Sequence, residues 1–276
     1  MSGWKAIARM CLWAGVASLA ALSVPAHAEP EPVAEVVLRS EPVEISHGVL
    51  KQWGEEIHEF GWRHYECAPM EEFPGTILCL FAHSVMMNDI FRGTAVAVEA
   101  PRGMISKSAL LGVDLRIEDL LAYRARHYPD GNPMIPEEDS DNAAGRERAF
   151  MFDVLPQLSE RYQAQAVVAA AWGNLSTIAH ELHHARYFSD TGYRTAIAEF
   201  WNEQLSEAER DKARAQLGTL YDSQNEDLII NEFQAYVLPG KPNSWAVSLN
   251  DTYRTALRDF LHGKGFSPLP AVEVEP

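Results

Sequence analysis

The sequence has few basic residues for its length. It carries 23 Lys and Arg against 39 Asp and Glu, which gives a formal net charge of -16. This balance argues against binding to nucleic acid, whose phosphates attract Lys and Arg, and against binding to anionic membranes. We therefore expect no nucleic-acid partner. The chain also lacks a Gly-rich phosphate loop and a Gly-x-Ser-x-Gly motif, two signatures that would indicate phosphate binding or a serine nucleophile.

Long apolar runs are also scarce, and the one near the start of the sequence is short. Lys5 and Arg9 precede the apolar residues 10–24, and Ala-His-Ala at 26–28 places small residues at the positions of a cleavage site. We expect residues 1–28 to be a secretory signal peptide, and the mature chain to be periplasmic or secreted without stable membrane insertion. The alternative is an uncleaved anchor, but the run is shorter than the ~18 residues of a spanning helix.

Cysteine is rare, with three in the whole chain. Cys11 lies inside the apolar run, so cleavage leaves Cys67 and Cys79. In an oxidising compartment such a pair predicts a disulfide, and the alternative is two buried free thiols. A cysteine metal site is disfavoured because neither residue has the close cysteine partner that such sites use.

Hydrophobic spacing predicts an α+β fold in one domain over residues 46–263. Residues 29–45 are expected to form a linker or pro-segment with a strand at 35–39. Residues 46–126 are expected to form a small mixed α/β part. Within that part we predict helices at 48–65 and 108–126 and strands at 76–82 and 94–99.

The second half of the chain is rich in helix signals. Residues 127–147 hold prolines and a run of acids, which predicts a solvated acidic loop, and their spacing fits no EF-hand calcium site. Residues 148–263 are expected to form a mainly helical part on which the mixed part packs, and residues 264–276 a disordered tail. The helices predicted there cover 152–172, 175–188, 193–205, 206–220, 223–237 and 250–262.

One predicted helix carries the pattern His-Glu-x-x-His, with His180, Glu181 and His184. Residues at i and i+4 lie one turn apart on the same helix face, so both imidazoles can reach one metal ion. Glu181 lies beside that face, close enough to act on a metal-bound water. His183 offers an alternative ligand register. The scattered His58, His64 and His83 are better explained as surface or core residues than as a second metal site.

A catalytic zinc takes three protein ligands, so a third should lie downstream. Glu232 ranks first, because it shares an otherwise apolar helix face with Ile229, Phe233 and Tyr236. A carboxylate on such a face is costly unless it is paired or bound to a cation. The alternative for Glu232 is an ion pair with Arg161 or Arg254. The other candidate ligands are Asp190, Glu199, Glu203, Glu226, Asp227 and His262.

His180-Glu-Leu-His-His184, followed downstream by Asn231-Glu232-Phe-Gln-Ala-Tyr236, resembles the zincin metallopeptidases, in the gluzincin-like subgroup whose third ligand is a helix-borne glutamate. The resemblance covers about residues 150–240 and implies a zincin-like fold, one Zn²⁺ held by His180, His184 and Glu232, and cleavage of a peptide or protein substrate. It also implies that the zinc activates a water whose proton Glu181 takes as general base. The thermolysin-type pattern has an aspartate where Tyr236 stands. Asp190 and Asn231 are possible replacements as partners of the ligands.

Several parts of the implied mechanism stay open at this point. The donor that stabilises the oxyanion could be Tyr236, Tyr187, Tyr193 or His183. The strand at 94–99 is our prediction for the sheet edge along which an extended substrate pairs. Two other functions compete with the peptidase: a zinc hydrolase of a non-peptide amide or ester, and a non-catalytic exported binding domain on a zincin-like scaffold.

Overall fold

A computed structural model of the chain describes residues 36–99, 110–133, 142–173, 175–239 and 247–269. The predicted signal peptide at 1–28 lies outside these residues, as does the start of the predicted linker up to residue 35. The described residues belong to one compact unit, Val33–Pro276. None of the helices in this part of the chain is long and apolar enough to cross a membrane.

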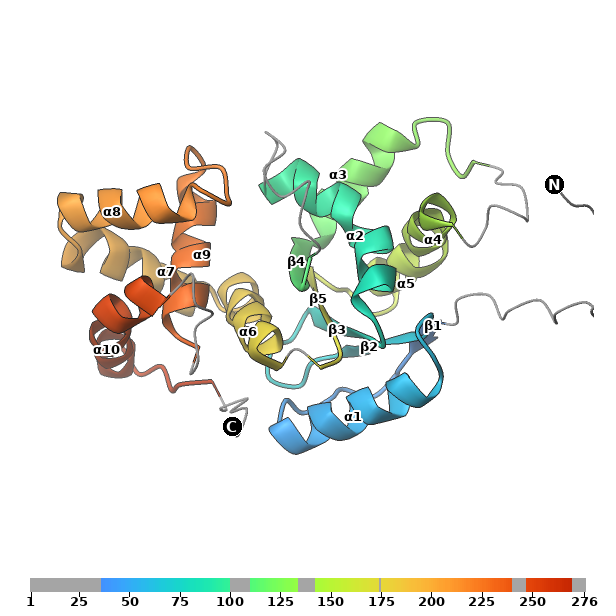
Figure 1. Cartoon of the computed structure of the whole chain (residues 1–276), viewed down its shortest axis with the longest axis horizontal. Coiled ribbons are helices and arrows are strands. Elements are labelled where there is room, and N and C mark those ends of the chain that lie inside the picture. The colour runs from blue at the N-terminus through green and yellow to red at the C-terminus, as the bar shows by residue number, and fades with distance from the viewer. Residues whose placement is uncertain (1–35, 100–109, 134–141, 174, 240–246, 270–276) are drawn as a thin grey trace, which may run out of the picture. The chain divides into compact units, whose positions relative to one another are not determined.

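The fold is α+β, with a five-stranded mixed sheet (Figure 1). The strands are β1 (Val36–Leu38), β2 (Tyr65–Pro69), β3 (Thr76–Phe81), β4 (Gly112–Arg116) and β5 (Ala166–Ala171). The helices are α1 (His47–Glu59), α2 (Ser84–Glu99), α3 (Ile117–His127), α4 (Ala143–Ala149), η3 (Phe150–Val154), α5 (Leu155–Glu160), α6 (Leu175–Ser189), α7 (Thr191–Glu199), η4 (Phe200–Gln204), α8 (Glu207–Leu217), α9 (Glu226–Val237) and α10 (Val247–Gly263).

The sheet has the strand order β1-β2-β3-β5-β4, so β1 and β4 are its edges. β1 runs parallel to β2, and β3 parallel to β5, whereas β2 pairs antiparallel with β3 and β4 antiparallel with β5. Cys67 and Cys79 lie directly opposite each other on β2 and β3 and form a disulfide. The predicted bridge is therefore confirmed.

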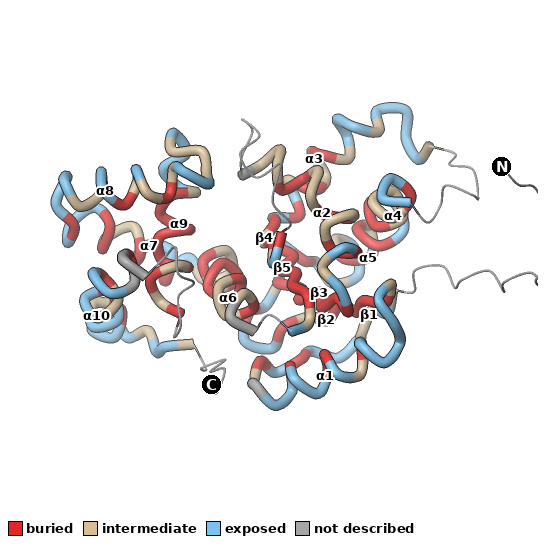
Figure 2. Tube along the Cα trace, in the orientation of Figure 1, coloured by how far each residue is buried: buried red, intermediate tan, exposed pale blue. Residues whose placement is uncertain are grey.

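Helices cover both faces of the sheet, which is why β3 and β5 are buried along their whole length (Figure 2). On one face α2, α3, η3 and α5 pack against residues such as Phe81, Val113 and Val167. On the other face α1 and α6 pack against Leu78, Leu80 and Val168. Burial on both faces favours apolar residues on both sides of a strand, and β5 accordingly contains only alanine and valine.

Helix α6 lies between the sheet and a third apolar cluster formed by α7 to α10 (Figure 1). Ile178, Leu182 and Ala185 recur at i, i+4 and i+7 and face the sheet. Tyr187, on the other side of α6, belongs to the cluster with α9. The side of α6 that carries the His-Glu-x-x-His pattern is therefore enclosed between two packed bodies.

Two elements predicted near the middle of the chain are wrong in type. Residues 94–99 form the end of α2, not a strand. Their alternating alanines and valines continue a helical recurrence of buried Met87, Phe91 and Ala95, and that spacing decides the outcome. Residues 108–126 are not one helix, because β4 precedes α3 there. Val113 and Leu115 alternate on the buried face of this short strand.

The helix predicted at 152–172 is also wrong beyond residue 160. The chain turns after α5, with Gln163 at a positive φ of 51°, and then enters β5. An alanine-rich run favours helix by propensity, but pairing with two neighbouring strands overrides that preference here. The predicted division into a mixed part at 46–126 and a helical part at 148–263 is corrected accordingly, because the inner strand β5 comes from the second part.

Three element boundaries also differ from the prediction. The helix predicted at 48–65 ends at Glu59, and residues 65–69 form β2 instead. The acidic loop predicted at 127–147 ends earlier, because Asn142 caps α4, while residues 134–141 lie outside the described part. The predicted tail packs for its first residues: Arg186 donates to the carbonyl of Ser267, and its guanidinium lies over the ring of Phe266.

Candidate metal centre

Helix α6 places the two histidines as the spacing predicts. The rings of His180 and His184 lie with centroids 4.7 Å apart, and their Nε2 atoms are 3.0 Å apart. Both nitrogens therefore converge on one point beside the helix. The side chain of His180 keeps 15% of its surface exposed, whereas that of His184 keeps 1%. Of the two rings, that of His180 is therefore the more exposed.

Helix α9 brings Glu232 to the same point. Its carboxylate oxygens lie 3.6 Å from Nε2 of His180 and 3.8 Å from Nε2 of His184. One ligand atom from each of the three residues lies within 4.8 Å of the other two. His180, His184 and Glu232 are the ligands that the sequence favours, and the structure brings them together.

The partner of His180 fixes which nitrogen is free to bind a cation. Nδ1 of His180 lies 3.0 Å from the backbone carbonyl oxygen of Ala235. A carbonyl oxygen can only accept, so Nδ1 carries the proton and Nε2 presents a lone pair. Burial lowers the pKa of His180 to about 4, and the ring is neutral at ordinary pH. Neutral imidazole is the form that binds metals.

Glu232 behaves as a carboxylate without enough partners. Its side chain is 2% exposed, and its Oε2 atom has no hydrogen-bond partner. Burial raises its pKa, while the proximity of His184 and a hydrogen bond with Tyr221 oppose that rise. Its oxygens lie within 4 Å of Nε2 of both histidines. A bound cation would satisfy this group, so the donor set fits a divalent metal.

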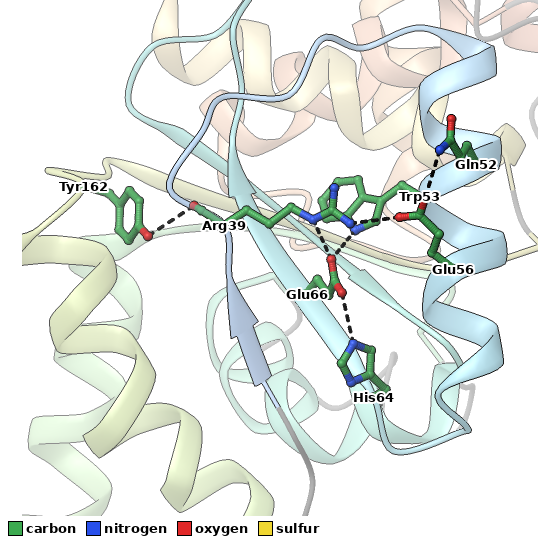
Figure 3. Close-up of polar contacts among 7 residues, drawn as sticks. All are labelled: Arg39, Gln52, Trp53, Glu56, His64, Glu66 and Tyr162. Carbon is green, nitrogen blue, oxygen red and sulfur yellow. Dashed lines mark hydrogen bonds and ion pairs between the residues drawn. The ribbon is translucent and has the colours of Figure 1, made fainter.

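The cluster around Glu66 shows how this protein satisfies a buried acid without a metal (Figure 3). Glu66 accepts from Arg39 at 2.6 Å and from the indole of Trp53 at 2.8 Å. Its other oxygen lies 3.1 Å from Nε2 of His64. Although burial raises the pKa of Glu66, its bonds to His64, Arg39 and Trp53 outweigh burial and lower it. His64 is thus a partner of Glu66, as expected for a structural histidine.

Glu181 is buried beside the three candidate ligands. One of its carboxylate oxygens, one oxygen of Asp114 and one ring nitrogen of His184 all lie within 4.8 Å of one another. Strand β4 passes directly over Glu181 at Gly112, where a Cβ atom would overlap Oε1 of Glu181 and lie 2.7 Å from its Cγ. The absence of a side chain at residue 112 therefore allows Glu181 its position.

Three contributors to the site were missed from the sequence. Gly112 and Asp114 lie on β4, which was predicted to be helix, and Tyr221 lies in the connection before α9. Nδ1 of His184 lies 3.7 Å from Oδ2 of Asp114. Burial raises the pKa of Asp114, and His184 opposes that rise. The alternation of Gly112 and Asp114 with buried Val113 and Leu115 was the signal that could have found the strand.

Tyr236, which stands where the thermolysin-type pattern has an aspartate, lies against His180. Its ring centroid is 4.4 Å from that of His180, and its hydroxyl lies 3.0 Å from the hydroxyl of Tyr221. Two of the other donor candidates are committed elsewhere. Tyr187 donates to Asp227, and Tyr193 donates to Gln234.

The remaining candidates are His183, Asp190 and Asn231. His183 is buried, and burial lowers its pKa. Asp190 caps α7 by accepting from the backbone of Tyr193 at 2.9 Å, and it lines a pocket of about 490 Å³ that contains none of the three candidate ligands. Asn231 accepts from Gln234. The hydrogen bonds of Asp190 and Asn231 thus go to Tyr193 and Gln234.

The other acids proposed as third ligands are engaged or exposed. Glu226 binds Trp201 and Arg214, and Asp227 binds Tyr187. Glu199 pairs with Lys264, and Glu203 is exposed. Among the described residues, the groups of His, Cys, Asp and Glu that could hold a metal are His180–His184–Glu232 and Asp114–Glu181–His184.

The chain matches no protein-family model, no curated protein sequence and no solved structure. The resemblance to zincins therefore rests on the residues of α6 and α9 and on the geometry they form.

Proposed function

We propose that this chain is a zinc-dependent peptidase with His180, His184 and Glu232 as the metal ligands and Glu181 as the general base. The observation that carries the proposal is the convergence of two imidazoles and a buried carboxylate, one oxygen of which has no hydrogen-bond partner, within 4.8 Å. Three protein ligands are typical of a catalytic zinc, whereas structural zinc sites have four.

The chain's own residues divide the chemistry between them. Zinc, when bound, acidifies a water and polarises the carbonyl of the substrate. The carboxylate of Glu181 is placed to accept a proton beside His184 and to return it to the leaving amine. Tyr236, whose ring lies against His180, is the donor that we assign to the developing oxyanion.

Strand β4 supports the choice of a peptide as substrate. It is an edge strand that pairs with β5 on one side, and within the described residues no strand pairs with its other side. An extended peptide can add to such an edge through backbone hydrogen bonds. Gly112 keeps this edge in contact with Glu181. β4 thus replaces residues 94–99 as the strand that we propose to hold the substrate.

We also propose that the chain acts after export. The apolar start of the sequence supports this, and the bridge between Cys67 and Cys79 suits an oxidising compartment. The protein purified from the periplasm or the medium should begin at Glu29. A full-length exported chain would contradict cleavage at this site.

The test of the activity is Glu181→Gln in the mature protein. We expect one zinc per chain in both parent and variant, measured by elemental analysis, because Glu181 is not a ligand. Hydrolysis of an unfolded protein and of a quenched-fluorescent peptide library should fall by about 10²- to 10⁴-fold, the contribution of a general base.

Glu203→Gln is the matched control, since it removes the same charge from an exposed position on η4. It should retain the activity of the parent. A Glu181→Gln variant as active as the parent would refute the mechanism. A parent that binds zinc but cleaves no peptide would contradict the peptidase assignment.

A further inference from the structure

The side of β4 that faces α6 forms a short row of residues at every second position. Val113 and Leu115 point into the core on the other face of the sheet, so Gly112 and Asp114 point toward α6. Gly112 contacts Glu181, and Asp114 pairs with His184. One strand thus touches both the candidate base and one candidate ligand.

His184 presents its two ring nitrogens to different groups. Nε2 faces His180 and Glu232. Nδ1 is buried, has no hydrogen-bond partner, and lies 3.7 Å from Oδ2 of Asp114. The side chains of His184 and Asp114 are 1% and 11% exposed, so little water competes for this contact.

We propose that Asp114 is the positioning residue of His184, an inference that rests on the proposed zinc site. A carboxylate beside Nδ1 holds the proton on that nitrogen, which leaves the lone pair of Nε2 for the metal and makes the ring a stronger ligand. The carbonyl of Ala235 does the same for His180. Each imidazole then has its own acceptor, one supplied by α9 and the other by the sheet.

The geometry separates this role from that of a ligand. Asp114 lies at the Nδ1 edge of the ring, whereas His180 and Glu232 lie at the Nε2 edge. Asp190 and Asn231 were the sequence-based candidates for partners of the ligands. They accept hydrogen bonds from Tyr193 and Gln234 instead. Tyr236 stands at the place on α9 where the family pattern has its aspartate, and it packs on His180 instead.

The test compares Asp114→Asn with the parent and with Asp130→Asn, which removes the same charge from an exposed loop. Zinc affinity is measured by competition with a chromophoric chelator. We expect Asp114→Asn to bind zinc about 10- to 100-fold more weakly than the parent, the usual cost of losing such a partner. Asp130→Asn should match the parent. The metal-free melting temperature of each variant reports whether it is folded.

A second measurement uses the unmodified protein. Imidazole nitrogen NMR of the zinc-loaded parent should show His184 protonated at Nδ1, and X-ray absorption should give the same zinc ligands in parent and Asp114→Asn. Unchanged zinc affinity in Asp114→Asn would overturn the inference, and so would the loss of an oxygen ligand in that variant. A parent that binds no zinc would instead overturn the proposed function itself.

Discussion

At the scale of single residues, the site depends on the lack of a side chain at Gly112. Its backbone does not require a glycine conformation, because its φ is not among the positive ones. The requirement is steric, since a Cβ there would overlap the carboxylate of Glu181. Glycine at this position therefore leaves room for Glu181, the proposed general base.

Gly112→Ala should separate catalysis from metal binding. The new methyl group pushes Glu181 aside, and a displacement of about 1 Å can reduce a rate by about 10²-fold. We expect the rate of peptide hydrolysis to fall by at least that factor, with zinc still bound. The measurement is kcat/KM together with zinc content.

Gly48→Ala is the control for Gly112→Ala, because a Cβ at Gly48 meets nothing within 4 Å. It should keep the parental rate. Full activity in Gly112→Ala would show that the contact between β4 and Glu181 does not position the base.

The three proposed ligands could be predicted from the sequence because each has a local signature. His180 and His184 are fixed by a helical repeat, and Glu232 by its place on an apolar face. Asp114 has no such signature. Its role depends on the pairing of β4 with β5, which joins residues far apart in the sequence, and no periodicity within one segment encodes that pairing.

At the scale of elements, the starts of helices could be predicted from capping residues. The choice between helix and strand in segments rich in alanine and valine could not. The capping box of Ser206 and Glu209 opens α8, where the sequence predicts a helix from residue 206. β5 was missed because alanine favours helix, and only its position between two strands makes it extended. Residues 94–99 were missed for the opposite reason, since their alternation favours a strand although the preceding helix continues through them.

The Glu66 cluster joins three elements and should make stability depend on acid. It ties α1, through Trp53, to β2 and to Arg39 after β1 (Figure 3). The pKa of Glu66 lies below its ordinary value of 4.5. Its stabilising effect is therefore complete above that value and is lost as pH falls through the lower pKa of the folded state.

Urea unfolding of the parent and of Glu66→Gln tests this linkage. At neutral pH the variant should lose about 2 kcal/mol of unfolding free energy, the scale of hydrogen bonds to a charged group. The difference should shrink as pH falls below 4.5. Glu160→Gln, at an exposed position, should show no such change. A difference that stays constant in acid would contradict the assigned role of Glu66.

At the scale of the whole molecule, the site forms where the sheet layer and the helical cluster meet. α6 contributes Ile178 to the apolar cluster against the sheet and Tyr187 to the apolar cluster of α7 to α10. Its histidines meet Asp114 from the sheet and Glu232 from the cluster. The mixed α+β class could be predicted from the sequence, whereas this meeting of two bodies on one helix required the tertiary structure.

The measurement that tests the central claim most directly is anomalous diffraction at the zinc edge, on crystals of the mature protein grown with zinc. We expect one anomalous difference peak within bonding distance of Nε2 of His180, Nε2 of His184 and the carboxylate of Glu232. That peak should be lost in Glu232→Gln. A parent crystal without a peak at this point, or with zinc held only by other residues, would contradict that claim.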